Sequence, residues 1–217
     1  MMNSKRKADN YNRKIKGVFM KQMMKLVGII AVVAMIGLGL SACEEPDPCA
    51  DCLKIGATGP AGGKIIYHNH AGFTVTGAGS FKAYYLEAAP TNQSTSVKWS
   101  STYDFVIEAE KTAIGTGKAN TAAIIAAHPS DTASNNAAKA AVAYSGGGKS
   151  DWFLPSKDEL NEMYEARTHL GISSGDFWSS SQDYYDAAWD QGFDHGGQSN
   201  GYFNKGQGRY VRAIRAF

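Results

Sequence analysis

The sequence predicts an α+β domain in which short strands from both ends of the domain meet in one sheet, with two to three helices between them. Three observations carry this prediction. Helix-favouring segments lie in the middle of residues 56–217, strand-type segments flank them, and no internal repeat or coiled-coil pattern interrupts this order. The 217 residues are 43% hydrophobic and 19% charged, which is typical of a globular protein and excludes a disordered or collagenous chain.

The first part of the domain is predicted to be extended. Closely spaced glycines at 59, 62 and 63 indicate a turn before the first strand. The elements that follow are a strand at 64–67, a hairpin turn at 69–72, a return strand at 73–75 and a further strand at 83–87 that ends before Pro90.

The middle of the domain is predicted to be helical. Asn120 is placed to cap a helix over 121–128, which Pro129 ends. The alanine-rich segment 134–144 favours a second helix, which the three glycines at 146–148 break.

A third helix has the clearest start signal. Ser156 and Glu159 have the spacing of a capping box, in which each side chain bonds the other residue's backbone N–H. The apolar residues 152–154 just before it are expected to anchor the helix to the sheet. One face of the helix then carries apolar side chains with an arginine at its edge, namely Leu160, Met163, Tyr164 and Arg167.

The last part of the domain returns to strands, at 177–179, 188–189 and 209–217. The final segment has apolar residues on both faces, as in a central strand. Arg212 and Arg215 are three positions apart, so they point to opposite faces of that strand. Each needs an acidic or carbonyl partner inside the domain, or else contacts a ligand.

The N-terminal segment has a pattern of charge and hydropathy that differs from the rest of the chain. Residues 26–40 are uncharged and mostly apolar, fewer than the roughly 20 that a membrane-spanning helix needs. Lysines precede them, and Leu-Ser-Ala-Cys43 follows, which resembles the lipobox whose cysteine is lipidated. We therefore predict a signal peptide over 1–42, a lipidated tether over 43–55 and the domain over 56–217. Alternative translation starts are Met20, Met23 and Met24. The predicted location is the bacterial cell envelope, at the outer membrane or cell surface.

The formal net charge of +2 averages two unlike parts of the chain. Eight of the 22 basic residues but only one of the 20 acidic residues lie in residues 1–42, so the remainder has 14 basic and 19 acidic residues, a net charge of −5. A surface with that charge argues against nucleic acid as a partner.

The cysteines and histidines give no complete metal site. Cys49 and Cys52 form a C-x-x-C pair that suits a small disulfide or two free thiols better than a redox centre or half a zinc site. His68 and His70 place two imidazoles on one side of an extended segment, but the sequence indicates no third ligand. We therefore predict no metal from these residues.

No catalytic set is evident either. The Gly-rich segment 146–150 lacks the first glycine of a phosphate loop and the helix that must follow it. The G-x-S-x-G match at 171–175 follows a helix and precedes a strand, which is the wrong order for a nucleophile elbow. The sequence thus predicts a protein that is not an enzyme, with a metal-dependent enzyme as the weaker alternative.

An aromatic and polar segment over 184–200 is the candidate ligand site. Exposed aromatic rings beside carboxylates and amides suit the faces and hydroxyl groups of sugars. The alternative is that Trp189 and Phe193 belong to the core. The candidate binding residues are Tyr184, Tyr185, Asp186, Trp189, Asp190, Asp194 and His195.

Five aspartates in the same region leave calcium open as a cofactor. They are Asp176, Asp183, Asp186, Asp190 and Asp194. Calcium takes six to eight oxygens, often from such loops, but the spacing does not fit an EF-hand. Solvated turn residues are the other interpretation.

Several sequence blocks together resemble the Lcl C-terminal domain family, a bacterial domain of unknown function found in exported lipoproteins. The most specific blocks are W-F-L-P-S-K-D-E-L from Trp152 and W-S-S-S from Trp178, and the resemblance covers 56–217. It implies a C-type-lectin-like α+β fold and extracytoplasmic binding, of glycans in some members, without catalytic residues. The chain departs from the adhesin-type members because it has only two collagen-like triplets, so it lacks their stalk.

These observations together predict a lipid-anchored binding module that recognises a glycan or a protein outside the cytoplasm. The alternative function is that of a structural envelope lipoprotein with no small ligand. An exposed apolar patch would favour this alternative.

Overall fold

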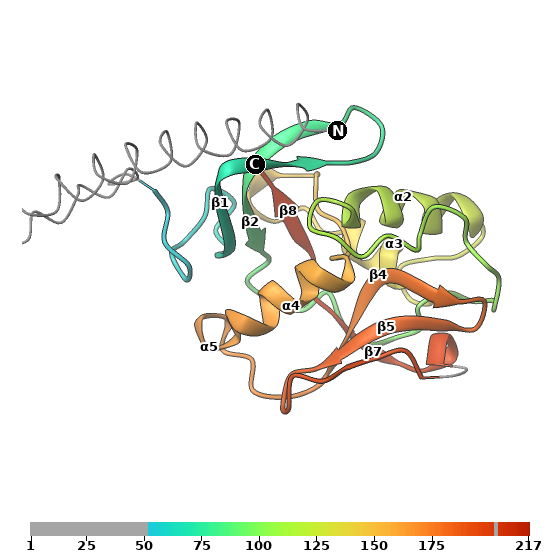
Figure 1. Ribbon diagram of the computed structural model, residues 1–217. Coiled ribbons are helices and arrows are strands. Elements are labelled where there is room, and N and C mark those ends of the chain that lie inside the picture. Colours follow the sequence, from blue (N-terminus) through green and yellow to red (C-terminus); the bar gives the residue numbers. More distant parts are fainter. Residues whose placement is uncertain (1–51, 202–203) are drawn as a thin grey trace, which may run out of the picture. The chain divides into compact units, whose positions relative to one another are not determined.

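Strands from both ends of the domain pair in one sheet, as the sequence predicts (Figure 1). The structure is a computed structural model that describes residues 52–201 and 204–217. The first sheet has the order β1-β2-β8, with antiparallel neighbours: β1 is Lys64–Val75, β2 is Phe81–Ala88 and β8 is Ile214–Ala216. The predicted signal peptide and the predicted lipidation site, Cys43, lie outside the described residues. Cys49 lies outside them as well.

The second sheet is assembled mainly from the C-terminal part of the domain. Its order is β3-β7-β4-β5-β6, and only the β4–β7 pair is parallel. The bounds are Ser94–Val97 for β3, Asp176–Tyr184 for β4, Ala187–Gly192 for β5, Gln198–Ser199 for β6 and Arg209–Val211 for β7.

The helices lie between the strand-rich ends of the domain, so the α+β class is confirmed, but the described residues form four α-helices and two sheets where the sequence predicts two to three helices and one sheet. The α-helices are α2 at Gly117–Ala127, α3 at Ala137–Val142, α4 at Lys157–Glu165 and α5 at Arg167–Leu170, and two 3₁₀ turns are η1 at Gly146–Gly148 and η2 at Asn204–Gly206. Within the described part of the chain, no helix is long and apolar enough to cross a membrane. These residues belong to one compact unit that begins at Asp51.

The predicted hairpin turn at 69–72 is wrong. Residues 64–75 form one strand, whose pairing with β2 passes from His68↔Tyr85 to Phe73↔Ala83. Four residues of β1 therefore face one residue of β2, which is a large bulge. The turn-type residues that suggested a hairpin are accommodated in this bulge, where Gly72 has a φ of 74°.

The start of α2 also differs from the prediction. The helix begins four residues earlier, at Gly117, and Asn120 is buried inside it with Nδ2 donating to the Lys111 carbonyl at 2.6 Å. A glycine is needed at the new start because a Cβ on Gly117 would lie 2.2 Å from Glu159 Oε2. This close approach comes from the start of α4, so no local signal could reveal it.

The capping box of α4 is confirmed. Ser156 Oγ accepts from the Glu159 N–H, and Glu159 Oε2 accepts from the Ser156 N–H at 2.7 Å. Glu159 Oε1 also accepts from the Gly115 N–H at 2.8 Å, so this buried carboxylate joins the starts of α2 and α4.

The core consists of two clusters that meet at the segment before α4. Trp152 and Leu154 pack with the first cluster, which includes Trp99, Trp178 and Ile124. Phe153, between them, packs with the second, which includes Phe177, Phe193, Leu86, Leu160 and Met163. Because alternate side chains of 152–154 enter different clusters, this segment anchors α4, as expected from its sequence.

The predicted central strand at 209–217 is split between the two sheets. Its first residues form β7 and its last residues form β8, with Arg212 and Ala213 between them. The loop after β2 provides the hydrogen bonds at this crossing: Arg212 Nη1 donates to the Ala89 carbonyl at 2.7 Å, and the Ala213 N–H donates to Gln93 Oε1 at 2.6 Å.

Candidate functional site

Six of the seven predicted binding residues, all except Trp189, lie in three different environments. Tyr184 and Tyr185 are exposed at the turn between β4 and β5. Asp186 and Asp190 are buried, 1% and 3% exposed. Asp194 and His195 are exposed beyond the opposite end of β5, on the order of 20 Å along the chain from the tyrosines. The seven residues therefore do not form one site.

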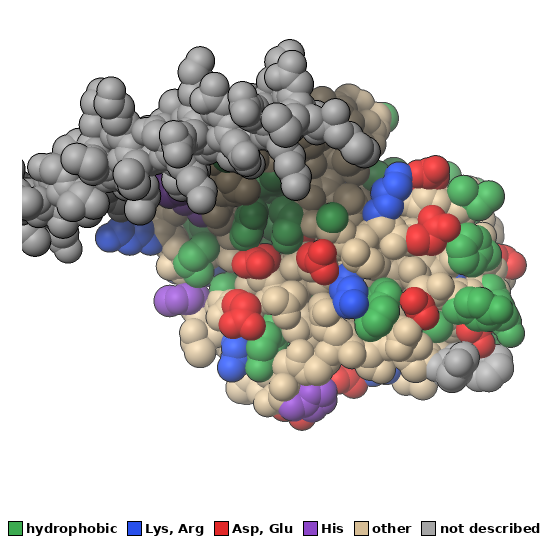
Figure 2. All heavy atoms as spheres, in the orientation of Figure 1, with side chains coloured by type: hydrophobic (Ala, Val, Ile, Leu, Met, Phe, Trp, Pro, Cys, Tyr) green, Lys and Arg blue, Asp and Glu red, His purple; other side chains and the backbone are tan. Residues whose placement is uncertain are grey.

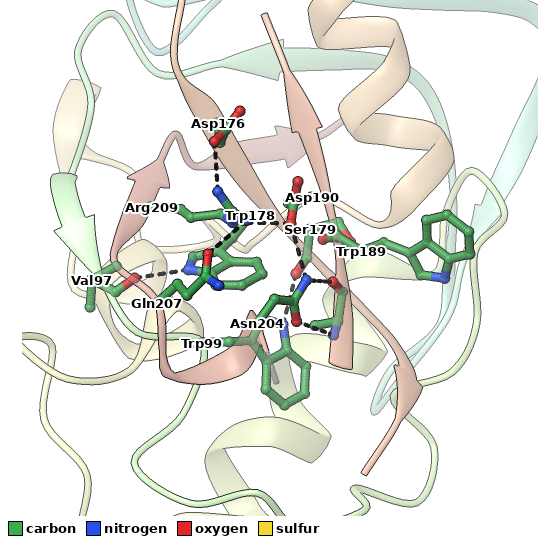
Figure 3. Close-up of polar contacts among 11 residues, drawn as sticks. Val97, Trp99, Asp176, Trp178, Ser179, Trp189, Asp190, Asn204, Gln207 and Arg209 are labelled. Atoms are coloured by element: carbon green, nitrogen blue, oxygen red, sulfur yellow. Dashed lines mark hydrogen bonds and ion pairs between the residues drawn. The ribbon is translucent and has the colours of Figure 1, made fainter. Parts of the chain in front are cut away.

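Asp190 belongs to a buried polar network (Figure 3). Arg209 bridges two carboxylates, with Nη1 at 2.6 Å from Asp176 and Nε at 3.0 Å from Asp190. Asn204 Nδ2 donates to Asp190 at 3.1 Å and to the Ala188 carbonyl at 2.7 Å. Burial raises the pKa of Asp190 to about 6, in spite of Arg209. Asp190 holds β5 to η2 and β7, which corrects its assignment to the ligand site.

The W-S-S-S block is also structural. Trp178 Nε1 donates to the Val97 carbonyl at 2.8 Å, and Trp99 Nε1 donates to the Ser179 carbonyl at 2.9 Å. Figure 3 shows Trp189 pointing away from this network. Trp189 is half-buried, with Lys157 Nζ 3.5 Å from its ring centroid. Phe193 is in the core, as the alternative interpretation expected.

Two neighbouring segments of the chain, joined through Lys205, each expose large apolar side chains, which we together call the aromatic surface. Each member is between 45% and 73% exposed, and the members are Tyr103, Phe105, Ile107, Tyr184 and Tyr185. Figure 2 shows hydrophobic side chains with acidic ones among them on the side of the molecule where the β4–β5 turn lies. The rings of Tyr184 and Tyr185 contact each other at 4.8 Å between centroids.

Lys205 joins the two loops of the aromatic surface. Its side chain is fully buried, and Nζ donates to the carbonyls of Asp104 at 2.9 Å and Tyr185 at 2.8 Å. A third bond goes to Gln182 Oε1 at 2.8 Å, and the same oxygen accepts from the Val106 N–H at 2.9 Å. One buried amine thus fixes the backbone beside residues from both loops.

The environment of Lys205 disfavours its charge. Burial lowers its pKa to about 7, although the nearby carboxylates of Asp186 and Asp104 act in the opposite direction. Its amine also lies 4.4 Å from the ring centroid of Trp99. Sequence reasoning missed Lys205, because a lysine next to glycine in a polar loop is normally a solvated residue.

The two C-terminal arginines have partners inside the domain. Arg215 donates to both oxygens of Asp151 at 3.0 Å and contacts Glu87 at 3.3 Å. Glu87 in turn accepts from the backbone N–H groups of Ala61 and Gly63. Arg212 donates to Asn92 Oδ1 at 2.6 Å as well as to the Ala89 carbonyl. Structural pairing, one of the two predicted roles, is therefore present for both.

The described residues bring together one group of three metal-ligating side chains. Ligand atoms of Cys52, His68 and His70 all lie within 4.8 Å of one another. The prediction that these histidines have no third ligand is therefore wrong, because the end of the predicted tether lies beside β1. The five aspartates proposed for calcium do not converge in this way, since Asp176 and Asp190 bind Arg209 and Asp183 binds Asn200.

No protein-family model matches this chain, and no curated protein matches it significantly. The resemblance to the Lcl C-terminal domain family stays a prediction that rests on the sequence blocks alone.

Proposed function

We propose that this protein is a lipid-anchored, non-catalytic binding module that recognises a glycan outside the cytoplasm through the aromatic surface. The observation that carries the proposal is the cluster of five exposed apolar side chains on two loops that one buried lysine holds together. Single exposed apolar residues are common, whereas a contiguous group marks an interaction site.

The chemistry around the aromatic surface suits a sugar. Tyrosine rings present flat apolar faces for the C–H groups of a pyranose, and their hydroxyls bind water or ligand oxygens. Beside them, Asn200 Nδ2 donates to the exposed carboxylate of Asp183 at 2.8 Å, and Thr102 Oγ1 donates to Asp104 at 2.6 Å. Such amide and carboxylate groups are the usual partners of sugar hydroxyls.

Preorganisation favours binding at this surface. A flexible loop loses conformational freedom when it closes on a ligand, which weakens affinity. Here Lys205 and Gln182 hold the backbone of both loops before any ligand arrives. The rings are therefore presented from a fixed frame, as expected of a recognition surface.

The fold and location complete the proposal. The pairing of terminal strands in the β1-β2-β8 sheet supports the C-type-lectin-like fold that the family resemblance implies. Lipidation at Cys43 would attach the domain to the cell envelope, at the outer membrane or cell surface. The net charge of −5 after residue 42 supports a partner other than nucleic acid.

A protein partner is the second candidate, and one observation favours it. Ile107 is the most exposed member of the aromatic surface at 73%, and an aliphatic side chain packs better against a protein than against a sugar ring. Recognition of a protein partner agrees with the alternative function from the sequence, a structural envelope lipoprotein.

The test is a glycan array probed with the full chain, with calcium and with chelator. We expect binding that survives chelation and falls at least tenfold in Tyr185→Ser. Tyr84→Ser is the matched control, because Tyr84 is an equally exposed tyrosine on β2 in the other sheet. Binding that Tyr185→Ser leaves unchanged would remove the aromatic surface from the site. Loss of binding on chelation would contradict the metal-independent mechanism, and no binding at all would favour the protein partner.

A further inference from the structure

The geometry of Cys52, His68 and His70 matches a metal site. Cys52 Sγ lies 3.7 Å from His68 Nε2, and the imidazole centroids of the two histidines are 4.3 Å apart. In tetrahedral zinc with bonds of about 2.3 Å to sulfur and about 2.0 Å to nitrogen, neighbouring S and N ligands are about 3.5 Å apart. The observed S–N distance is close to that value, so small side-chain movements would complete the set.

His68 is held on a paired part of β1 and is supported from behind, and His70 follows it at the bulge of the same strand. His68 pairs with Tyr85 across β1 and β2, and their rings stack at 4.4 Å with an angle of 6°. Tyr85 stacks in turn on Phe217 at 5.3 Å. Ligands held on strands are more precisely placed than ligands on loops. His70 is exposed while Cys52 and His68 are half-buried, so an ion can reach the group from solvent.

The oxidation state of Cys52 determines what this group can bind. Cys52 is disulfide-bonded in the structure. A disulfide sulfur is a weak ligand, whereas a thiolate is a strong one for zinc. Metal affinity at this position should therefore depend on whether the disulfide is open.

We propose that Cys52, His68 and His70 form a redox-gated site for Zn²⁺, separate from the aromatic surface. A dithiol reductant supplies two electrons that break the S–S bond, becomes a disulfide itself, and passes its two protons to the two released sulfurs. Zn²⁺ then binds Cys52 Sγ with loss of the thiol proton, together with one nitrogen from each imidazole, and water completes the tetrahedron. When a small-molecule disulfide accepts two electrons and two protons and becomes two thiols, the S–S bond of Cys52 forms again, which removes the thiolate ligand and releases the metal.

The experiment measures zinc bound to the full chain, purified in detergent, in oxidised and phosphine-reduced forms after equilibrium dialysis. We expect about one Zn²⁺ per reduced chain and at least a hundredfold weaker binding to the oxidised chain. Co²⁺ in place of Zn²⁺ should give the absorption band of a thiolate–cobalt bond in the reduced form alone.

A variant of His70 tests one of the proposed ligands. His70→Asn should weaken zinc binding to the reduced chain at least a hundredfold. Because His70 is exposed, we expect the variant to fold like the parent, which circular dichroism checks. His195→Asn is the control, because His195 is an exposed histidine outside the group. Reduced protein that binds no zinc, His70→Asn that binds like the parent, or equal binding to oxidised protein would each overturn the proposal.

Discussion

Two buried basic residues, Arg215 and Lys205, differ in pKa shift because their partners inside this domain differ. Arg215 faces the carboxylates of Asp151 and Glu87. Burial opposes its charge, but the hydrogen bonds and charges of these partners outweigh burial and raise its pKa. Lys205 bonds two carbonyls and an amide oxygen, all neutral, and burial lowers its pKa to about 7.

The two residues therefore have different roles: Arg215 stabilises the fold through ion pairs, whereas Lys205 holds two loops in place through hydrogen bonds. The Arg215 cluster joins β8, β2 and the segment before α4, and in it one guanidinium faces two carboxylates. Lys205 lies under the aromatic surface, and its hydrogen bonds to neutral oxygens order the backbone there. Because these partners carry no charge, they do not offset burial, and the pKa of the amine stays near neutral pH. The four changes below sharpen this contrast, beginning with the largest expected effect.

Among the four changes, replacing Arg215 should lower the free energy of unfolding the most. Arg215→Met leaves the fully buried carboxylate of Glu87 without its cation, and breaking such a pair costs about 3–5 kcal/mol. Chemical denaturation at pH 7 measures the loss in the free energy of unfolding. The double variant Glu87→Gln/Arg215→Met should recover part of it. A loss below about 1 kcal/mol in the single variant would show that the charges are not coupled.

Lys205 should make stability rise with pH. Between its folded pKa of about 7 and the ordinary value near 10.5, the unfolded chain holds a proton that the folded chain lacks. The free energy of unfolding therefore increases as pH rises through this window, by up to about 1.4 kcal/mol per pH unit. Lys205→Met should lack this increment, so we would compare denaturation of the two proteins from pH 7 to 9.5. Parallel pH profiles would mean that the amine stays charged when buried.

Glu159 is a buried carboxylate without a cation and should show the opposite slope. Burial raises its pKa to about 7, so the folded chain holds the extra proton between pH 4.5 and 7 and stability falls as pH rises. Glu159→Gln keeps the shape of the side chain and one hydrogen-bond acceptor, but the glutamine does not titrate. Relative to the parent, its free energy of unfolding should rise by at least about 1 kcal/mol from pH 5 to pH 8. A constant difference between those pH values would contradict this reasoning.

The smallest effect on stability is expected on the aromatic surface itself. Ile107→Ser and Tyr185→Ser remove exposed side chains, and such changes usually alter stability by less than about 0.5 kcal/mol. Thermal melts alongside Tyr84→Ser measure this. A loss above about 1.5 kcal/mol in either variant would show that these side chains serve packing rather than recognition.

Local signals were reliable where a few neighbouring residues define the structure. The capping box of Ser156 and Glu159 and the early end of β2 before Pro90 were predictable for this reason. The exposure of Tyr184 and Tyr185 was predictable too, since they sit in a polar turn. The failures at 69–72 and 117–120 have a common feature, because both segments lie against distant parts of the chain, β2 and the start of α4.

The candidate sites depend on contacts between distant segments. Asp186 and Asp190 were indistinguishable in sequence from exposed aspartates, and only Arg209, Asn204 and the surrounding sheet make Asp190 internal. Lys205 gained its role from carbonyls about 20 and 100 positions away.

By itself, the sequence determined the α+β class, the meeting of the terminal strands and the start of α4, because hydrophobic pattern and capping chemistry act over a few residues. Tertiary structure alone decided which polar residues face inward and which side chains form the aromatic surface. It also decided that Cys52 lies beside His68 and His70. These arrangements arise when strands from separate parts of the chain pair, and a polar side chain reveals its role only through the partner that pairing brings to it.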